Sequence, residues 1–281
     1  MTPHMPRLNR TAATQRNDLP MAATIRMPVL RLACLMLALG FVPAGANAVE
    51  HVVSLNLCSD QMLVLLAPEK VAALSPLARD PALSFVAAQA ARLPTVRPSA
   101  EAVLRLHPDL VLAGAYGAQT TLALLEQEGV PVWRLSMPQD FDAIREQTRL
   151  VAARLGVPDR AATLISGMDA TLRAVLLPAH RVTALAWQPR GYTEGPGTLM
   201  DAILRAAGLT DVGNGRPVGL EALLRHPPDV LVVPPDSAYP SLATDLLESP
   251  ATGDIPRRVL PTPLTICGGP FTAHAVALLA Q

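Results

Sequence analysis

The side chains best suited to binding chemistry follow short apolar runs that are typical of buried strands. Three aromatic residues, Tyr116, Trp187 and Tyr192, occupy such positions in a chain with an aromatic content of only 3%. Flat rings at strand ends could stack on a planar ligand, and Arg79 and Arg190 could bind its carboxylate or phosphate groups. Two alternatives stay open: Trp187 could belong to a sheet core, and each arginine could be a solvated loop charge.

Four further candidates lie at the first and last expected strands. Asn56 and Cys58 follow the first strand, and Cys267 and Phe271 follow the last. A disulfide between the cysteines would connect the two halves of the chain and requires Cα atoms within about 7 Å. Alternatively, two free thiols could face the ligand and bind a soft metal, or both cysteines could be small buried residues.

A repeat organises the chain around these positions. Residues 98–112 and 217–232 share Glu, Ala, Leu, Arg, Pro and Asp, with eight positions from Glu101 to Asp109 and from Glu221 to Asp229. In each copy the glutamate suits a helix N-terminus, the proline ends the helix, and an all-apolar run predicts a buried strand. Two lobes duplicated about 120 residues apart explain the match better than two unrelated units.

Strands and helices are expected to alternate through both halves, which predicts an α/β fold with mainly parallel sheets. The expected strands are Val52–Leu55, Val71–Leu74, Leu110–Ala113, Val132–Leu135, Val182–Ala186, Val230–Val233 and a weak final strand near Thr262–Ile266. The expected helices are Asp60–Leu66, Ala100–Leu106, Thr120–Glu128, Phe141–Leu155, Pro158–Leu177, Leu199–Ala207, Leu220–Arg225, Leu242–Leu247 and Ala273–Leu279. Ser59 and Asp140 are the expected caps of the first and fourth helices.

Proline boundaries single out one long helix between the two halves. Pro158 suits its start and Pro178 its end, and 20 residues at about 1.5 Å each give about 30 Å, the width of a small lobe. We therefore expect two α/β lobes, residues 49–157 and 179–281, joined by a single connecting helix within residues 158–178. Ligands of such lobes are expected at the carboxyl ends of the strands.

The N-terminal 48 residues have the pattern of a secretory signal peptide, whose start could be Met21 or Met27. Arg26 and Arg31 precede an apolar run at 32–42, and the run is followed by an Ala-Asn-Ala cleavage site at 46–48. Export to the periplasm would leave 233 residues with 18 basic and 22 acidic side chains. This balance gives no polyanion-binding surface, so no nucleic-acid partner is expected.

The exported region from Val52 to about His274 resembles the periplasmic solute-binding proteins of metal-chelate ABC importers, which serve cobalamin, heme and ferric siderophores. The resemblance rests on the first strand with Asn56, the segment Lys70–Leu74, the two repeat copies, the signal peptide and the connecting helix. It implies two Rossmann-like lobes around a cleft and a monomer that works with a permease dimer. In that family one glutamate on each lobe docks into arginine pockets of the permease, and the matching positions are Glu101 and Glu221. Alternatively, each glutamate only stabilises its own helix, by about 0.3–1 kcal/mol.

The resemblance, Tyr116, Trp187 and the lack of a cationic cluster favour cobalamin or a related corrinoid as ligand, with a ferric siderophore second. Heme is an alternative that needs an axial Tyr or His. Only His274 among the exported histidines lies near an expected ligand loop, and Tyr116 is the other candidate. No resident cofactor and no protein metal site are expected, since the ligand would itself be the cobalt or iron chelate.

Two other classes are weaker. A zinc or manganese binder would present several His and carboxylate ligands, but the expected ligand loops contain one histidine. An exported enzyme is the least favoured, because the sequence contains no G-x-S-x-G, C-x-x-C, H-E-x-x-H or Walker A motif.

Overall fold

The structure is a computed structural model that describes residues 49–236 and 244–281, so the predicted signal peptide lies outside the described residues. The strands are β1 Val52–Ser54, β2 Val71–Ala73, β3 Leu110–Gly114, β4 Val132–Leu135, β5 Val182–Ala186, β6 Leu209–Asp211, β7 Val230–Val233 and β8 Arg257–Val259. The helices are α1 Leu57–Leu66, α2 Ala87–Ala90, α3 Ala100–Leu104, α4 Gln119–Gln127, α5 Phe141–Leu155, α6 Pro158–Arg173, α7 Leu199–Ala206, α8 Leu220–Arg225 and α9 Ala273–Leu279. Across the described part of the chain, no helix is both long and apolar enough to cross a membrane.

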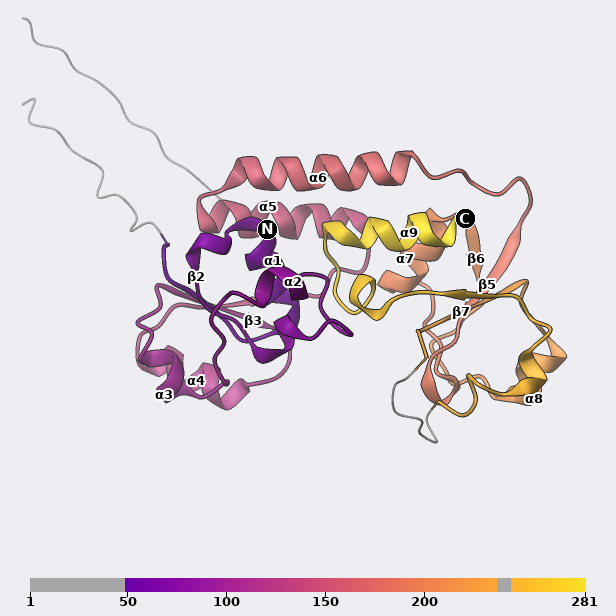
Figure 1. The fold of residues 1–281 in the computed structure, drawn as a ribbon, viewed down its shortest axis with the longest axis horizontal. Coiled ribbons are helices and arrows are strands. Elements are labelled where there is room, and N and C mark those ends of the chain that lie inside the picture. Colours follow the sequence, from indigo (N-terminus) through magenta and orange to yellow (C-terminus); the bar gives the residue numbers. More distant parts are fainter. Residues whose placement is uncertain (1–48, 237–243) are drawn as a thin grey trace, which may run out of the picture. The chain divides into compact units, whose positions relative to one another are not determined.

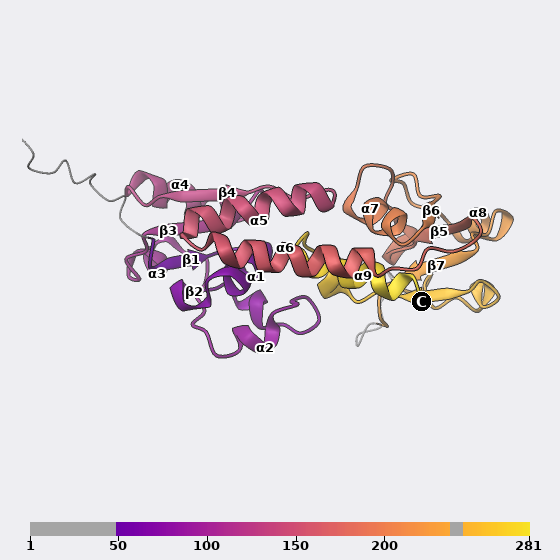
Figure 2. The same ribbon diagram turned by 90° about the horizontal axis from the view of Figure 1, so that it is seen from above.

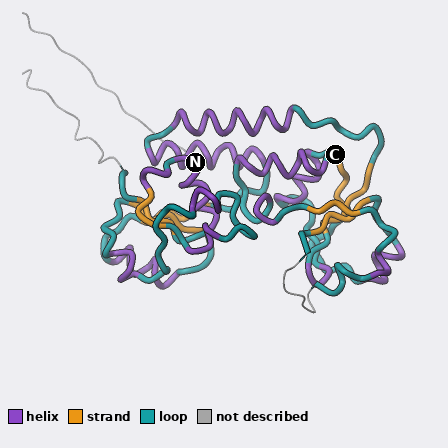
Figure 3. The backbone as a smooth tube through the Cα atoms, in the orientation of Figure 1, coloured by secondary structure: helices purple, strands orange, loops and turns teal. Residues whose placement is uncertain are grey.

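Two separate four-stranded sheets form the centres of two lobes (Figures 1 and 3). Their strand orders are β2-β1-β3-β4 and β6-β5-β7-β8, and every pairing is parallel. Across each sheet the strands therefore follow the same order: the lobe's second strand in the chain lies at one edge, then its first, third and fourth. This confirms the predicted α/β class with two lobes.

Helices cover both faces of the N-terminal sheet, as its apolar strands require. Leu110 and Leu112 of β3 pack in one buried cluster with side chains of α1, α5 and α6. Val111 and Ala113 point the other way and pack with side chains of α3 and α4. This alternation follows directly from the period of two along a strand.

The repeated aspartates have a structural role that explains their spacing. The Asp109 carboxylate accepts hydrogen bonds from the backbone N–H groups of Glu50 and His51, at 2.9 and 2.8 Å, just before β1. The Asp229 carboxylate accepts from the backbone N–H and the hydroxyl of Thr183, both at 2.7 Å, in β5. These backbone hydrogen bonds lower the pKa of both carboxyls. Each copy of the repeat thus fixes its lobe's third strand beside the first.

Helix α6 follows α5 of the N-terminal lobe and reaches α9 of the C-terminal lobe, as Figure 2 shows from above. A shared apolar core accompanies this connection. Leu57, Phe141 and Ile144 of the N-terminal lobe are buried in one cluster with C-terminal residues such as Phe271 and Val276. The lobes are therefore joined by packing as well as by a helix.

Several predicted elements differ from the structure. Helix α1 begins three residues earlier than predicted, because Asn56 and not Ser59 is its cap. Helix α6 ends at Arg173 and not at Leu177. Pro178 disfavours a helical conformation for Leu177, the residue before it, but it does not explain why the helix ends four residues earlier. The weak strand near Thr262–Ile266 is wrong, since this segment contains the 3-10 helix Thr262–Leu264.

Two strands were missed, and one predicted helix is wrong in its described part. Strands β6 and β8 are the edges of the C-terminal sheet and carry polar residues, including Arg257 and Arg258 in β8. Edge strands need no continuous apolar run, so the pattern that identifies central strands fails there. The predicted helix Leu242–Leu247 is a turn over its described residues. By contrast, β4, β5, β7, α5, α8 and α9 have the predicted bounds, and Asp140 caps α5 by accepting from Ala143 N at 2.7 Å.

Candidate ligand cleft

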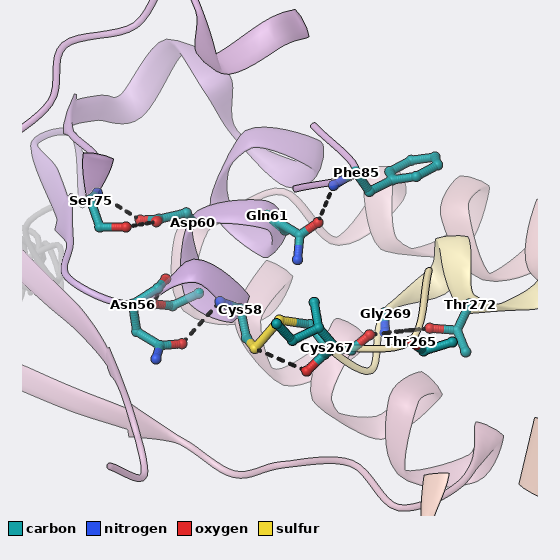
Figure 4. The surroundings of a disulfide bond; sticks show 12 residues. Asn56, Cys58, Asp60, Gln61, Ser75, Phe85, Thr265, Cys267, Gly269 and Thr272 are labelled. Carbon is teal, nitrogen blue, oxygen red and sulfur yellow. Dashed lines mark hydrogen bonds between the residues drawn. A yellow bond between two sulfur atoms is a disulfide. The ribbon is translucent and has the colours of Figure 1, made fainter. Parts of the chain in front are cut away.

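A disulfide between Cys58 of the N-terminal lobe and Cys267 of the C-terminal lobe connects the two lobes (Figure 4). Cys58 lies in the first turn of α1, where the Asn56 side chain caps the helix by accepting from Cys58 N at 2.9 Å. Cys267 lies in the turn before α9, and the two Cα atoms are 5.3 Å apart. Of the three alternatives that the sequence left open for these cysteines, the structure has the disulfide.

Three adjoining cavities lie along this junction. The first, of about 310 Å³, is lined by the disulfide, by Ser136–Gln139 after β4 and by C-terminal residues that include Glu194 and Thr265. The second, of about 200 Å³, shares Glu194, Thr265 and Ile266 with the first. The third, of about 590 Å³, shares Pro234 and Thr262 with the second and extends to residues 81–83 of the N-terminal lobe. We call this series the cleft.

The charge of the cleft is acidic. Its charged lining residues are Glu194, Asp236, Glu248 and Arg257. Arg257 is already engaged, since its guanidinium donates to the Leu247 carbonyl at 2.5 Å and to the Thr252 hydroxyl. None of the three cavities has a histidine in its described lining. Within the part of the chain that the structure describes, no group of three or more His, Cys, Asp or Glu side chains is placed to hold a metal ion.

Several neutral polar groups of the cleft present acceptor oxygens. Ser136 Oγ donates its proton to Gln147 Oε1 at 3.0 Å, and Gln139 Nε2 donates to the Met137 carbonyl at 3.0 Å. Apart from the second amide N–H of Gln139, these donors are used inside the protein, and the oxygen lone pairs of both side chains can accept hydrogen bonds from a ligand.

Glu194 is the charged residue common to the two smaller cavities. Burial raises the pKa of its carboxyl, a hydrogen bond with Thr198 opposes this shift, and the nearby Asp211 carboxylate adds to it. A half-buried acid without a cation beside it is costly to ionise. It therefore favours a ligand group that donates a hydrogen bond or carries positive charge.

The predicted aromatic residues do not form a stacking platform in the cleft. Trp187 is fully buried in the C-terminal core, and its Nε1 donates to the Val218 carbonyl at 3.0 Å. The prediction of Trp187 as a ligand residue is therefore wrong, and its alternative role in the sheet core is correct. Tyr116 and Tyr192 are 77% and 49% exposed and do not line the three cavities.

The predicted arginines and Asn56 also act differently from the prediction. Arg79 donates to the carbonyls of Ala90 and Leu93 and thereby stabilises the end of α2 and the turn after it in its own lobe. Arg190 is exposed in a tight turn with a left-handed φ of 63° and does not line the cleft. Asn56 caps α1 and packs against Gly114, where a Cβ would lie 2.6 Å from Asn56 Nδ2.

Phe271 lies on the α6 side of the molecule and not in the cleft. Its ring stacks on Phe85 with centroids 4.7 Å apart, and Phe85 in turn stacks on His274 at 6.0 Å. The three rings line a separate cavity of about 290 Å³ together with residues of α6, Leu65 and Pro270. Of the nine predicted ligand residues, Cys58 and Cys267 line the cleft.

The strongest cleft residues were missed because the prediction did not follow every strand outward. Ser136 and Gln139 directly follow the correctly predicted strand β4, so its carboxyl end was a sufficient signal. Gln188 follows β5 in the same way, and it was passed over for the larger Trp187 and Tyr192. Glu194 carries no sequence signal that separates it from a solvated loop acid.

Comparison with known proteins decides the family. Residues 52–256 match the family described as Periplasmic binding protein. The chain belongs to this family. Periplasmic binding proteins of this class bind small metal chelates and work with ABC permeases. The match confirms the family resemblance that the sequence analysis based on the repeat and the strand pattern.

Similar proteins bind different chelates. A "Cobalamin-binding protein" of Halobacterium salinarum (strain ATCC 29341 / DSM 671 / R1) is 27% identical over 146 residues, which are 47% of this chain and 39% of that protein. The chain thus aligns with about two fifths of that relative's length. The heme-binding protein RhuT from Roseiflexus sp. RS-1 in its apo form is 26% identical, with 83% of this chain and 97% of that chain covered and a TM-score of 0.65. A heme-binding protein from Pseudomonas aeruginosa is 24% identical, with coverages of 83% and 91% and a TM-score of 0.64, and it shows the shared fold alone.

Proposed function

We propose that this periplasmic binding protein captures a corrinoid, cobalamin or a close relative, and delivers it to an ABC permease. The observation that carries the proposal is a cleft that presents acceptor oxygens and an acid, with its one described arginine already engaged. The rim of a corrin ring carries carboxamide side chains whose N–H groups are hydrogen-bond donors. Donors on the ligand and acceptors on the protein complement each other. The Halobacterium relative supports the same choice.

The same chemistry opposes an anionic ligand. A carboxylate or catecholate that is buried without a positive partner pays a large desolvation penalty. In this cleft it would also meet Glu194 and, in the widest cavity, Asp236 and Glu248. A ferric siderophore of high negative charge is therefore a poorer match than a neutral or cationic chelate.

Heme is the second candidate, and one observation favours it. Tyr116 is 77% exposed in the loop after β3, at the edge of the sheet that faces the cleft, where a phenolate could serve as an axial ligand. The similarity to RhuT covers most of both chains. The heme propionates, however, would need cations that the described cleft lining does not offer.

The deciding experiment is a calorimetric titration of the protein purified from the periplasm. We expect saturable binding of cyanocobalamin or cobinamide with a dissociation constant in the micromolar range or below, and no saturable binding of ferric siderophores. Tight binding of hemin that is lost in Tyr116→Phe, without binding of either corrinoid, would replace the proposal by heme capture. Bound zinc or manganese, without binding of any chelate, would show that the ligand is a bare metal ion and not a metal chelate.

We further propose that residues 1–48 direct export, that the protein acts as a monomer, and that Glu101 and Glu221 dock it to the permease dimer. Glu101 lies in the first turn of α3 and Glu221 in the first turn of α8, and both are exposed. Glu101 also pairs with Arg105 of the same helix at 2.5 Å. Two acids at equivalent places of two similar lobes suit a partner with twofold symmetry.

Charge reversal at both docking positions should abolish uptake without weakening ligand capture. In the double variant Glu101→Lys/Glu221→Lys we expect ligand-dependent growth or uptake to fall at least tenfold, because each lysine would meet a basic pocket. Ligand affinity of the purified variant should stay within twofold of the wild type, since neither residue lines the cleft. The exposed Glu128→Lys is the matched control. Normal uptake by the double variant would contradict the docking assignment.

A further inference from the structure

Glu194 is held at a fixed position where the two smaller cavities of the cleft meet. The preceding residue, Thr193, is buried, pairs with Trp187 in a short antiparallel bridge and donates to the Arg216 carbonyl at 2.7 Å. The following residue, Gly195, lies so close to the 214–215 backbone that a Cβ would be 2.8 Å from Gly215 N. The chain on both sides of the carboxylate is therefore fixed by packing.

No protein cation neutralises this carboxylate in the cleft. The described lining of the two cavities that share Glu194 contains no Lys, Arg or His. The charged group that acts on it from behind is Asp211 of β6, another acid. Beyond its hydrogen bond with Thr198, this half-buried carboxylate keeps lone pairs that a ligand donor can satisfy.

The groups beside Glu194 strengthen its preference. Ser136, which lines the same cavity, has used its hydroxyl proton inside the protein, and Gln139 has used one of its two amide N–H groups and presents its amide oxygen. A ligand edge of carboxamide N–H groups can be matched by all three residues. A carboxylate on the same edge would face three acceptor groups and the charge of Glu194, with one remaining N–H of Gln139 as a donor.

We infer that Glu194 determines specificity by accepting hydrogen bonds from side-chain carboxamides of the ligand and by rejecting ligands that carry a carboxylate at the same place. The inference rests on the proposed function and adds which ligand groups this site distinguishes, carboxamides from carboxylates. Rejection by an acid without a cation in its described lining is a repulsive element of the kind that specific sites combine with attractive contacts. Hydrogen bonds to charged groups are strong enough to change affinity by about 10- to 100-fold.

The test uses cyanocobalamin and its b-, d- and e-monocarboxylic acids, in each of which one side-chain amide is replaced by a carboxylate. We expect the wild-type protein to bind cyanocobalamin at least tenfold more tightly than one or more of the three acids. Glu194→Gln, which has the same shape without the charge, should reduce that ratio to within about threefold. Glu194→Ala, which removes the acceptor, should weaken cyanocobalamin binding itself. Glu128→Gln, at an exposed position outside the cleft, should behave as the wild type.

Each outcome has a defined consequence. A wild-type protein that binds all three acids as tightly as cyanocobalamin would overturn the inference while supporting the proposed function. An unchanged ratio in Glu194→Gln would overturn it in the same way. A wild-type protein that binds none of these corrinoids would overturn the proposed function, and the inference falls with it. Thermal unfolding of both variants at the wild-type temperature would show that the changes arise at the site and not from misfolding.

Discussion

Replacement of both cysteines in Cys58→Ala/Cys267→Ala should lower the free energy of unfolding by roughly 2–5 kcal/mol. The disulfide closes a loop between residues 209 positions apart, and it therefore restricts the unfolded chain strongly. Alanine suits both sites because Cys267 is buried at 3% exposure and a serine hydroxyl would need a partner there.

Urea unfolding with and without a reductant tests this expectation. Reduction should destabilise the wild type to about the level of the double variant and should leave the double variant unchanged. The double variant serves as its own control because the third cysteine of the chain, Cys34, lies within the predicted signal peptide. Wild-type stability that does not respond to a reductant able to expose two thiols would contradict the stabilising role.

The lobes should nevertheless stay together when the disulfide is absent. Leu57, Phe141 and Ile144 of one lobe share a buried core with residues of the other, and α6 packs along both. Burial of such side chains contributes about 1.5–3 kcal/mol each. We therefore interpret the disulfide as one of three connections between the lobes, together with α6 and the shared core.

The fold was accessible from the sequence because central strands and long helices carry dense local signals. Strand β7 is four consecutive buried apolar residues, and α5 combines an Asp140 cap with a regular apolar stripe. The repeat added the arrangement of the lobes, since Asp109 and Asp229 make similar bonds, Asp109 to the backbone just before β1 and Asp229 to Thr183 in β5. Edge strands such as β8 lack these signals, because they pair with one strand only and are exposed to solvent along their other edge.

The cleft was harder to predict because a strand end locates a loop and does not orient its side chains. Trp187 and Gln188 are neighbours after β5, yet the tryptophan enters the core and the glutamine lines a cavity. The period of two along an extended chain makes such neighbours point to opposite sides. Arg79 was misjudged for a related reason, since its backbone partners are Ala90 at the end of α2 and Leu93 just after it, a short helix that the sequence analysis did not predict.

Asp60 is expected to make the protein less stable as the pH rises from 4 to 7. Its side chain is fully buried in α1 and accepts hydrogen bonds from Ser75 N at 3.1 Å and from the Ser75 hydroxyl. Burial raises the pKa of this carboxyl from 3.8 to about 7, against the lowering effect of its bonds with Ser54 and Ser75. The folded state therefore binds a proton that the unfolded state has already lost in this interval. A shift of about three pKa units corresponds to about 4 kcal/mol, fully present below pH 4 and lost as the pH approaches 7.

Asp60→Asn isolates this contribution. The amide can still accept from Ser75 N and can donate to the Ser75 hydroxyl, but it cannot ionise. The unfolding free energy of the variant minus that of the wild type should therefore rise by several kcal/mol between pH 4 and pH 8 in urea titrations. The same difference for the exposed Asp254→Asn should stay flat. A flat difference for Asp60→Asn would mean that Asp60 ionises as easily in the folded protein as in the unfolded chain, so that its bonds with Ser54 and Ser75 would have to offset the whole cost of its burial.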